Sequence, residues 1–395
     1  MSLYGWFGRA LRVNLSTGVI TGEDIDQKLL VAWIGGRGLG ARIVAEEVPA
    51  GCDPLGGENK LVFAAGPLTG TKVPGSGRFS ASSKSPLTGT ILDSNAGGTW
   101  GVRFKKCGYD VLIIEGKSDV PVYLAVTQET VTLHDAGELW GADVMVTNHR
   151  LKDKMGKDAS IACIGPAGEN LVKFASIMND GSRALGRGGL GAVMGSKKLK
   201  AILVQGSKNV ELAHMEKLDF MVYEASKWIK ANPITSQGLP EFGTPVLVNL
   251  FNELGVFPVR NFQTSQFPEA GKISGEAIAE TMTTGRKGCY NCPVQCTRLI
   301  KTKTGTVGGP EYESMHLTGE RIWNLERLYN LKAGLDSSFD TLPPRLLEEP
   351  VPEGPSRGRI VELKPMLAEY YRFRGWDACG VPSPKKLREL GLEEM

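Results

Sequence analysis

Three cysteines lie close together in the segment GRKGCYNCPVQCTRL. Cys289, Cys292 and Cys296 have the spacing Cys-x2-Cys-x3-Cys. Thiolates at these separations on a turn can converge on one soft metal centre, and three such ligands are typical of an iron–sulfur cluster. Zinc is the main alternative, although zinc sites usually combine two pairs of ligands and no second pair follows downstream. A purely structural role is the third alternative. The spacing favours an iron–sulfur cluster.

A 4Fe–4S cluster normally has four thiolate ligands, so the position of the fourth is open. Cys379 is the one cysteine downstream of the motif, and three others precede it in strand or loop contexts: Cys52, Cys107 and Cys163. Buried free cysteines are common, and each of these three is better explained as part of the core or a loop. The odd total of seven cysteines argues against a disulfide framework.

Glycine is the residue type whose frequency departs most from the average. It accounts for 50 of 395 residues, nearly twice the ordinary share of about 7%, which indicates tight turns and backbone brought close to a ligand. The net charge of +3 is too small to predict a nucleic-acid surface. No apolar run reaches the ~18–20 residues of a membrane span. The amino terminus, MSLYGWFGRALRVNL, has no signal-type apolar core, which predicts a cytoplasmic location.

The longest glycine-rich segment is NDGSRALGRGGLGAVMGSKK. Its residues Gly186–Gly191 match G-x-G-x-x-G, which is a weak signal of dinucleotide binding. No strand is expected directly before the motif. The next predicted strand ends in Val204–Gln205 and lacks the acidic residue that would bind a ribose. The segment does combine backbone N–H groups with four basic residues: Arg183, Arg187, Lys197 and Lys198. Such a concavity suits phosphate or another anion. A tightly packed turn is the alternative.

A second stretch has the same character. Arg78 is followed by Ser94–Gly98, with the sequence SNAGG. Two glycine-rich anion sites in one domain would fit a bulky cofactor that carries phosphate.

The elements that must position these residues change in type near residue 210. Before it, short β-type runs bounded by turn residues predict strands at Leu61–Ala65, Val111–Glu115, Val122–Val126, Ile161–Ile164 and Ala201–Val204. After it, apolar periodicity and end signals predict helices at 214–231, from Thr244 as N-cap to Gly255, at 275–283, at 319–333 and around 363–374. The pattern indicates a β-rich N-terminal domain joined to a smaller helical region.

Taken together, these segments resemble the tungsten-containing aldehyde ferredoxin oxidoreductases. The resemblance is carried by GRALRVNLSTG, NKLVFAAGPLTGT, GRFSASSKSPLTG, GYDVLIIEGK, IGPAGENLVKFASIMNDGSRALGRGGLGAVMGSKKLKAI, FGTPVLVN, PVRNFQT, the Cys289 motif, GPEYES and GERIWNLERLYNLKAGLD. It is nearly continuous from residue 5 to Ser314 and resumes at Gly319. The family has a long helical segment between these two points, which supplies the fourth cluster cysteine, and this chain lacks it. The chain therefore resembles a family member with an internal deletion after Ser314.

The resemblance implies an α+β fold in three parts. Residues 1–209 would form a tungstopterin-binding, β-rich domain of two sheets with flanking helices. Residues 210–314 would form a helical domain that carries the cluster cysteines, and residues 315–395 a reduced helical tail. Loss of the helical cover should expose apolar surface, so we expect lower stability than in a complete member.

The resemblance also implies the cofactors and their ligands. A tungsten or molybdenum atom would be held by the dithiolenes of two pterins, and Cys289, Cys292 and Cys296 would hold a 4Fe–4S cluster beside them. Arg78 would lie between cluster and pterin, and the backbone carbonyls of Asn95 and Ala184 would bind a magnesium ion that bridges the pterin phosphates. The pterin site would be lined by Gly97, Gly98, Arg183, Leu185, Gly186, Arg187, Gly188 and Gly189.

Two carboxylates, Glu311 and Glu313, lie in GPEYES and would share a face on extended backbone. By resemblance, Glu313 lies near the metal and takes a proton from water or stabilises the developing acid. Either glutamate is otherwise explained as a solvated charge. His316 is a candidate substitute for a metal-adjacent histidine of the missing segment, and ordinary exposure is the alternative.

The implied function is oxidation of an aldehyde to its carboxylic acid, with two electrons leaving one at a time through the cluster to ferredoxin. One alternative is a related family member that acts on an aromatic or acyl thioester. Another is a non-catalytic remnant that binds cofactor or transfers electrons, and a third is a zinc-stabilised scaffold. A homodimer is expected from the family, and neither nucleic acid nor a membrane is expected as a partner.

Overall fold

The computed structural model describes residues 3–156, 158–259, 265–302 and 305–307, and, of the remainder, residues 324, 327–328, 331, 336–342, 344–350, 360–390 and 392–393. The chain folds as two compact units, Met1–Ile300 and Lys301–Met395. No helix in the described part of the chain is long and apolar enough to cross a lipid bilayer.

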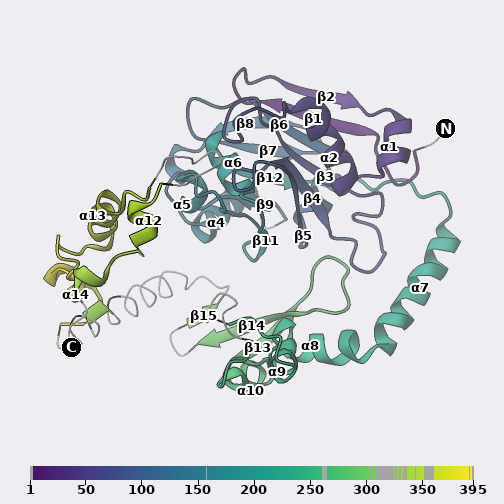
Figure 1. Cartoon of the computed structure of the whole chain (residues 1–395). Helices are drawn as coiled ribbons and strands as arrows, with labels where there is room; N and C mark the ends of the chain where they lie inside the picture. The colour runs from purple at the N-terminus through teal and green to yellow at the C-terminus, as the bar shows by residue number, and fades with distance from the viewer. Residues whose placement is uncertain are drawn as a thin grey trace. The chain divides into compact units, whose positions relative to one another are not determined.

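The first unit begins with two six-stranded mixed sheets (Figure 1). The first sheet has the order β2-β1-β6-β3-β4-β5, in which β1 and β6 are parallel and the other neighbours antiparallel. Its strands are β1 (Arg9–Asn14), β2 (Ile20–Asp24), β3 (Leu61–Ala65), β4 (Phe79–Lys84), β5 (Ile91–Ala96) and β6 (Val111–Glu115).

The second sheet has the order β11-β10-β9-β12-β7-β8, in which β12 and β7 form the parallel pair. Its strands are β7 (Val122–Thr127), β8 (Val131–Asp135), β9 (Ser160–Cys163), β10 (Ile177–Asn179), β11 (Arg183–Leu185) and β12 (Leu199–Gln205). β5 is the last strand of the first sheet and β11 the last of the second, and these two edge strands contact each other.

Both faces of the central strands are buried, which explains their continuous apolar sequences. In β6, Leu112 and Ile114 face a core shared by the two sheets, whereas Val111 and Ile113 face a second core on the other side of the first sheet. Trp100, fully buried in the shared core, donates from Nε1 to the carbonyl of Ile202 at 3.0 Å. The shared core therefore fixes the chain that leads directly out of the SNAGG segment.

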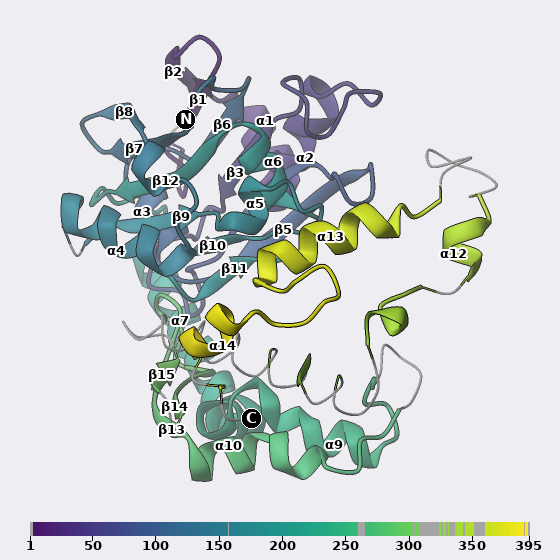
Figure 2. The same cartoon turned by 90° about the vertical axis from the view of Figure 1, so that its left-hand side faces the viewer.

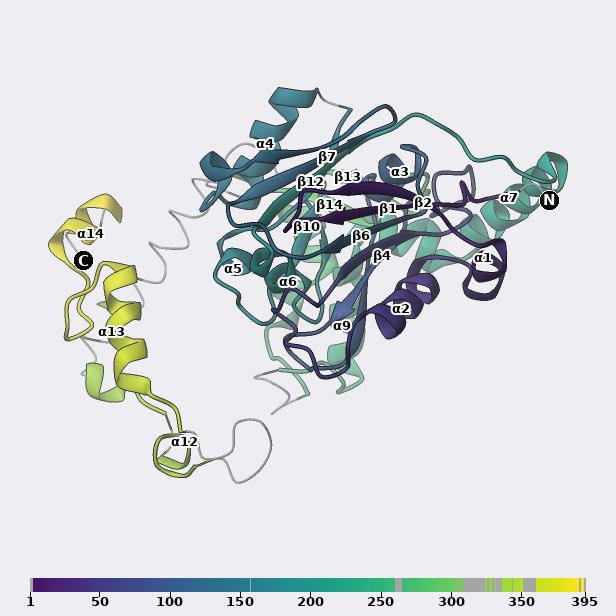
Figure 3. The same ribbon diagram turned by 90° about the horizontal axis from the view of Figure 1, so that it is seen from above.

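Helices cover the outer faces and ends of the sheets. α2 packs on β3 and β4 of the first sheet, α4 packs on β9 of the second, and α5 and α6 lie side by side (Figures 2 and 3). The helices of this part are α1 (Gln27–Trp33), α2 (Gly36–Glu47), α3 (Trp100–Lys105), α4 (Val144–Met155), α5 (Pro166–Glu169) and α6 (Leu190–Ser196), with a 3-10 turn at Gly137–Leu139.

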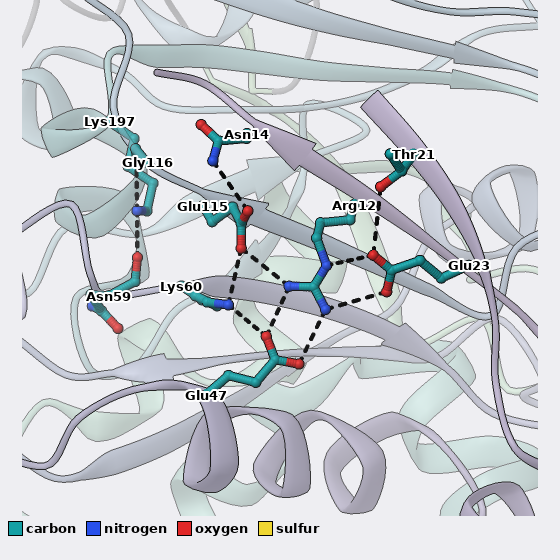
Figure 4. A network of polar contacts seen from close by, with 10 residues as sticks. All are labelled: Arg12, Asn14, Thr21, Glu23, Glu47, Asn59, Lys60, Glu115, Gly116 and Lys197. Carbon is teal, nitrogen blue, oxygen red and sulfur yellow. Dashed lines mark hydrogen bonds and ion pairs between the residues drawn. The ribbon is translucent and has the colours of Figure 1, made fainter. Parts of the chain in front are cut away.

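An ionic network joins α2 to the first sheet (Figure 4). Arg12 on β1 pairs with Glu23 at 2.7 Å, Glu47 at 2.8 Å and Glu115 at 3.1 Å. Lys60 pairs with Glu47 at 2.5 Å and with Glu115 at 2.9 Å. Burial acts to raise the pKa of Glu47 and Glu115, but hydrogen bonds from Arg12 and Lys60 hold both below their ordinary value.

The rest of the first unit is helical and ends in a hairpin. Its elements are α7 (Met215–Ala231), a π-helical turn η2 (Ile234–Gly238), α8 (Leu239–Phe242), 3-10 turns at Thr244–Val246 and Ala270–Ile273, α9 (Leu247–Glu253), α10 (Gly275–Thr281), β13 (Thr283–Lys287) and most of β14 (Thr297–Thr302), across which the boundary between the two units falls. β13 and β14 are antiparallel, and the three clustered cysteines lie in the loop between them. No residue of α7 is buried, and Phe220 and Trp228 on it are exposed.

The second unit contains β15 (Gly305–Val307), a 3-10 turn at Ser337–Phe339, α12 (Pro344–Glu348), α13 (Leu363–Arg374) and α14 (Pro384–Leu390). Buried Arg327 forms two hydrogen bonds to the carboxylate of Asp340, at 2.9 and 2.7 Å, and the hydroxyl of Tyr371 donates to the same carboxylate. Burial and the Asp340 carboxylate raise the pKa of Tyr371 to about 12.

The α+β fold predicted from the sequence is confirmed, including two sheets followed by a helical region. Two details differ. Thr244 is not the N-cap of a helix: Gly243, with φ of 71°, precedes a 3-10 turn in which Thr244 makes no capping bond, and the α-helix begins at Leu247. The helix expected at 319–333 lies for the most part outside the described residues.

Candidate metal-cluster and anion site

The cysteine loop makes tight local turns. Cys289, Cys292 and Cys296 are partly exposed free thiols. Asn291 and Gln295, the residues before the second and third cysteines, have φ of 46° and 47°, a left-handed conformation that is uncommon outside glycine. Asparagine adopts it more readily than most residues, which suits Asn291 to this position.

Hydrogen bonds attach this loop to the two-sheet part of the unit. The side-chain amide of Asn291 donates to the carbonyls of Lys72 and Val73, and the backbone carbonyl of Asn291 accepts from the backbone N–H of Gly75 at 3.0 Å. The hydroxyl of Tyr290 donates to the carbonyl of Gly70 at 3.2 Å. The cysteine loop is therefore hydrogen-bonded to the loop formed by residues 70–75.

The first cysteine reaches the SNAGG segment. A Cβ placed on Gly97 would lie 2.6 Å from the sulfur of Cys289 and 3.8 Å from Nε of Arg78. The backbone N–H of Tyr290 donates to the carbonyl of Gly98 at 3.2 Å. The structure thus brings together Cys289, Arg78 and Gly97, and only a residue without a side chain fits between the sulfur and the arginine.

A cavity of about 500 Å³ lies beside the cysteine loop, and Cys289, Cys292 and Lys72 line it. Cys296 is not among its lining residues, and its carbonyl lies against Gly243 instead. Across the residues that the structure describes, no three His, Cys, Asp or Glu side chains converge on a single metal ion. An iron–sulfur cluster does not require such convergence, because each cysteine binds a different iron atom. The three thiols thus do not form a preassembled single-metal site, an arrangement compatible with ligands that bind separate irons of a cluster.

Two residues that the sequence analysis missed hold the SNAGG segment in place. Asn179, fully buried at the end of β10, donates from Nδ2 to the carbonyl of Gly97 at 2.8 Å. The carboxylate of Asp180 accepts from the N–H groups of Thr99 at 2.6 Å and Trp100 at 3.2 Å, and from the Thr99 hydroxyl at 3.0 Å. Their signal was the Asn-Asp-Gly turn within NDGSRAL, which looks like an ordinary hairpin turn.

Arg183 lies opposite Asn179 in the β10–β11 pairing. Its Cγ lies 3.3 Å from the position that a Cβ on Gly98 would occupy. Nη2 of Arg183 and Oδ1 of Asn179 are buried and have no hydrogen-bond partner. Buried polar atoms are rarely left unpaired, and a buried guanidinium N–H without a partner fits an anionic ligand such as a phosphate.

The predicted glycine run adjoins the SNAGG segment. The backbone N–H of Arg187 donates to the Ser94 hydroxyl at 3.4 Å, and the Ser85 hydroxyl donates to the carbonyl of Gly188 at 2.7 Å. A Cβ on Gly189 would collide with the carbonyl of Lys173, so this glycine is also required for packing. The expectation that no strand directly precedes the run is wrong, because β11 ends at Leu185; it is a three-residue edge strand in an antiparallel pair, not the strand of a dinucleotide-binding unit.

The remaining predicted residues are placed as follows. The Asn95 side chain accepts from Ser80 at 2.8 Å and lies on edge strand β5, while Ala184 lies on edge strand β11. Leu185 is buried in the shared core, and a Cβ on Gly186 would meet only Ala184, at 3.8 Å. Glu313 lies outside the described residues, as do Glu311 and His316.

Two predicted basic residues donate hydrogen bonds to backbone carbonyls. The buried amine of Lys197 donates to the carbonyls of Asn59 and Gly116 (Figure 4), and the amine of exposed Lys198 donates to the carbonyl of Asp119. The amine of Lys197 is therefore directed at backbone carbonyls away from the glycine run, whereas the contribution of Lys198 to the anion site stays a prediction. Burial lowers the pKa of Lys197 to about 8.

Two family descriptions match the chain. "Aldehyde ferredoxin oxidoreductase, N-terminal domain" matches residues 10–206, and "Aldehyde ferredoxin oxidoreductase, domains 2 & 3" matches residues 221–319 and 314–392. A tungsten-containing aldehyde ferredoxin oxidoreductase of Pyrococcus furiosus is 34% identical over 603 aligned positions, which cover 99% of this chain and 100% of the relative. The enzyme of that name from Thermococcus kodakarensis is 33% identical with the same coverage.

More distant similarities extend to other reactions. An aliphatic sulfonate oxidoreductase, WOR-like subunit, of Pyrococcus furiosus is 33% identical over 81% of this chain and 54% of the relative. Among solved structures, the active site complex BamBC of benzoyl coenzyme A reductase, with 1,5 dienoyl-CoA, superposes with a TM-score of 0.67 and 33% identity. That superposition covers 76% of this chain and about half, 48%, of the solved chain.

The alignments confirm the expected internal deletion. The alignment to the Pyrococcus furiosus enzyme has 603 positions and this chain has 395 residues, so roughly 200 positions of the relative have no counterpart here. The second family description matches in two pieces that meet at residues 314–319, where the deletion was predicted.

Proposed function

The chain belongs to the aldehyde ferredoxin oxidoreductase family, and from this we propose that it oxidises an aldehyde to a carboxylic acid and passes the electrons through a 4Fe–4S cluster to ferredoxin. The observation that carries the proposal is the approach of Cys289 to Gly97 beside Arg78, because it joins the thiolate loop to the glycine-rich anion site. A redox centre bound at the cysteine loop and another bound at the glycine-rich site would be close enough for electrons to pass between them.

The proposed cofactors are a 4Fe–4S cluster and a tungsten or molybdenum bis-pterin whose phosphates are bridged by magnesium. Cys289, Cys292 and Cys296 would hold the cluster. The fourth ligand of the family comes from the segment that this chain lacks, and the carboxy-terminal tail does not supply one in the family at the position of Cys379. When bound, the metal–pterin group accepts the two electrons of the oxidation.

The chain's own residues bind and orient this group. Arg183 supplies an unpartnered buried N–H to an anionic oxygen, and Arg78 supplies positive charge between the two centres. Asn95 and Ala184 would offer backbone carbonyls to magnesium, and the bare backbone of Gly97, Gly98, Gly186, Gly188 and Gly189, with Leu185 and Arg187, would line the pterin. Glu313 would take the proton released from water during the reaction.

A second candidate function is action on an aromatic or acyl thioester. The similarity to the benzoyl coenzyme A reductase complex favours it, at 33% identity over 76% of this chain. A third is a non-catalytic remnant that binds cofactor or transfers electrons, which the roughly 200 missing positions favour.

Anaerobic purification followed by metal analysis and a viologen-linked assay tests these candidates. Iron and tungsten (or molybdenum) with aldehyde turnover is the expected result, and thioester turnover instead would favour the second candidate. Iron without tungsten or turnover would favour an electron-transfer remnant. Zinc without visible absorption, or no metal at all, would overturn the proposal.

A further inference from the structure

The backbone from Gly97 to Trp100 is held by three separate groups. Asn179 donates to the carbonyl of Gly97, and Asp180 accepts from the N–H groups of Thr99 and Trp100. On the other side, the N–H of Tyr290 in the cysteine loop donates to the carbonyl of Gly98. This four-residue segment therefore lies between the cysteine loop and the β10–β11 hairpin and is hydrogen-bonded to both.

Asn179 and Asp180 are themselves tightly constrained. Asn179 is fully buried, and Asp180 has φ of 54°, a left-handed conformation that aspartate adopts more readily than most residues. The two side chains also meet, with Asn179 Nδ2 3.1 Å from Asp180 Oδ2. The hairpin turn therefore presents both side chains to the Gly97–Trp100 backbone as one unit.

The same hairpin carries Arg183, which lies opposite Asn179 and packs against Gly98. If the Gly97–Trp100 backbone moved, its distances to Arg183 and to Cys289 would both change. The space for such movement is small, because the Cys289 sulfur already lies against Gly97.

We propose that Asn179 and Asp180 are positioning residues that fix the separation between the Cys289 thiolate and the Arg183 anion site. This inference rests on the proposed function, in which a cluster binds at Cys289 and a phosphate-bearing cofactor binds at Arg183. Groups that orient the ligands of a metal centre, without touching the metal, set its redox properties as well as its retention.

The test compares Asn179→Asp with Asn59→Asp in the full chain, with Asp180→Asn as a second variant. Each Asn→Asp change removes an amide donor from a fully buried asparagine: Asn179 loses its bonds to Gly97 and Asp180, and Asn59 loses its bonds to Pro54 and Lys84. Both changes should therefore lower the unfolding temperature. Among the described residues, the side chain of Asn59 is hydrogen-bonded to Pro54, Ser83 and Lys84 and not to the cysteine loop. Asn59→Asp therefore measures the effect of lost stability alone.

The first readout is independent of bound cofactor. In metal-free full chain, the rate at which iodoacetamide modifies Cys289 is measured by mass spectrometry relative to exposed Cys379. Asn179→Asp and Asp180→Asn should raise this ratio about tenfold, because the unsatisfied bond favours local opening, whereas Asn59→Asp should leave it unchanged. An equal ratio in all variants would overturn the proposal.

The second readout uses anaerobically purified protein. The reduction potential and the electron paramagnetic resonance line shape of the reduced cluster should change in Asn179→Asp at unchanged iron content, and stay as in the parent for Asn59→Asp. If the parent contains no iron, the proposed function fails while the alkylation result still decides the positioning role. If the parent cluster is present and both asparagine variants behave alike, the positioning role fails and the proposed function stands.

Discussion

The sulfur of Cys289 lies directly against the backbone of Gly97, so closely that a methyl group on the glycine would come within 2.6 Å of it. The two residues are far apart in the chain and belong to different parts of the first unit. Their contact joins the cysteine loop to the strand that leads to the predicted pterin site.

Gly97→Ala tests this contact. The added methyl group must displace the Cys289 sulfur, and overpacking of this kind costs about 1–3 kcal/mol. We expect iron per chain to fall at least about threefold in anaerobically purified protein. Gly57→Ala is the matched control, since a Cβ there meets nothing within 4 Å. Equal iron in the two variants would contradict the assigned geometry.

Serine substitution of each clustered cysteine tests the cluster ligands. Cys289→Ser, Cys292→Ser and Cys296→Ser should each reduce iron content and visible absorption by more than half, because thiolate is the preferred ligand of the cluster iron. Cys379→Ser should leave both unchanged. A loss of iron in Cys379→Ser as large as in the other three would instead identify this residue as the fourth ligand.

Glu313→Gln tests the proposed proton acceptor. Loss of a general base typically reduces turnover about 10²–10⁴-fold, and iron and tungsten contents should be unaffected. Glu311→Gln, two residues away, is the control and should retain turnover within about threefold of the parent. Comparable loss in both variants would argue against a specific role for Glu313.

The ionic network around Arg12 predicts a loss of stability in acid. The pKa of Glu47 and of Glu115 is lowered in the folded state, so their contribution is present above the unfolded pKa, near 4.5, and is lost as pH falls through the folded pKa. Arg12→Leu removes a shared partner and should destabilise the chain by about 1–3 kcal/mol at pH 7.

Denaturant titrations between about pH 3 and 7 measure this effect. In Arg12→Leu the fall in stability between about pH 5 and 3 should be smaller than in the parent, because without Arg12 the folded pKa of the two carboxylates rises toward the unfolded value and less proton uptake accompanies unfolding. Lys272→Gln, which breaks an exposed pair with Glu269, should change stability by less than about 0.5 kcal/mol. Superimposable pH profiles for parent and Arg12→Leu would show that the network contributes nothing.

Two buried lysines predict a gain of stability in mild alkali. Burial lowers the pKa of Lys105 and of Lys197 to about 8, below the ordinary value of 10.5, so the unfolded chain binds more protons above pH 8 and stability rises with pH. The thermal unfolding temperature should rise between about pH 7.5 and 9. Above this range the thiols of Cys107 and Cys163, whose pKa burial raises to about 12, act in the opposite sense.

Lys197→Met isolates one of these groups. Methionine occupies similar space without a titrating amine, so the rise in unfolding temperature between pH 7.5 and 9 should be smaller than in the parent. Lys272→Met, at an exposed position, should retain the full rise. An unchanged rise in Lys197→Met would mean that this amine does not titrate in that range.

Local apolar sequence was enough to predict the central strands. LVFAA and VLIIE are continuous apolar runs because both faces of β3 and β6 are buried, and the predicted bounds are those observed. β11 was missed because only Leu185 of its three residues is buried. α2 was missed because three glycines, which disfavour helix, lie in its first five residues.

The parts of the site whose chemistry follows from residue type alone could be predicted from the sequence. The parts that depend on where a side chain points in the fold could not. Clustered thiols and glycine runs were visible in the sequence. The orientation of Lys197 toward the carbonyls of Asn59 and Gly116 was not, since a charge near a glycine run does not reveal where its amine points. Asn179 and Asp180 resemble any turn until the fold brings Gly97 and Thr99 to them.

The contact between β5 and β11 has a consequence for aggregation. Each is the last strand of its sheet, and unpaired strand edges recruit strands from other polypeptides. Because β5 and β11 lie against each other, each shields part of the other's edge. A substitution that separated the two sheets here would expose both edges, and we expect it to promote aggregation.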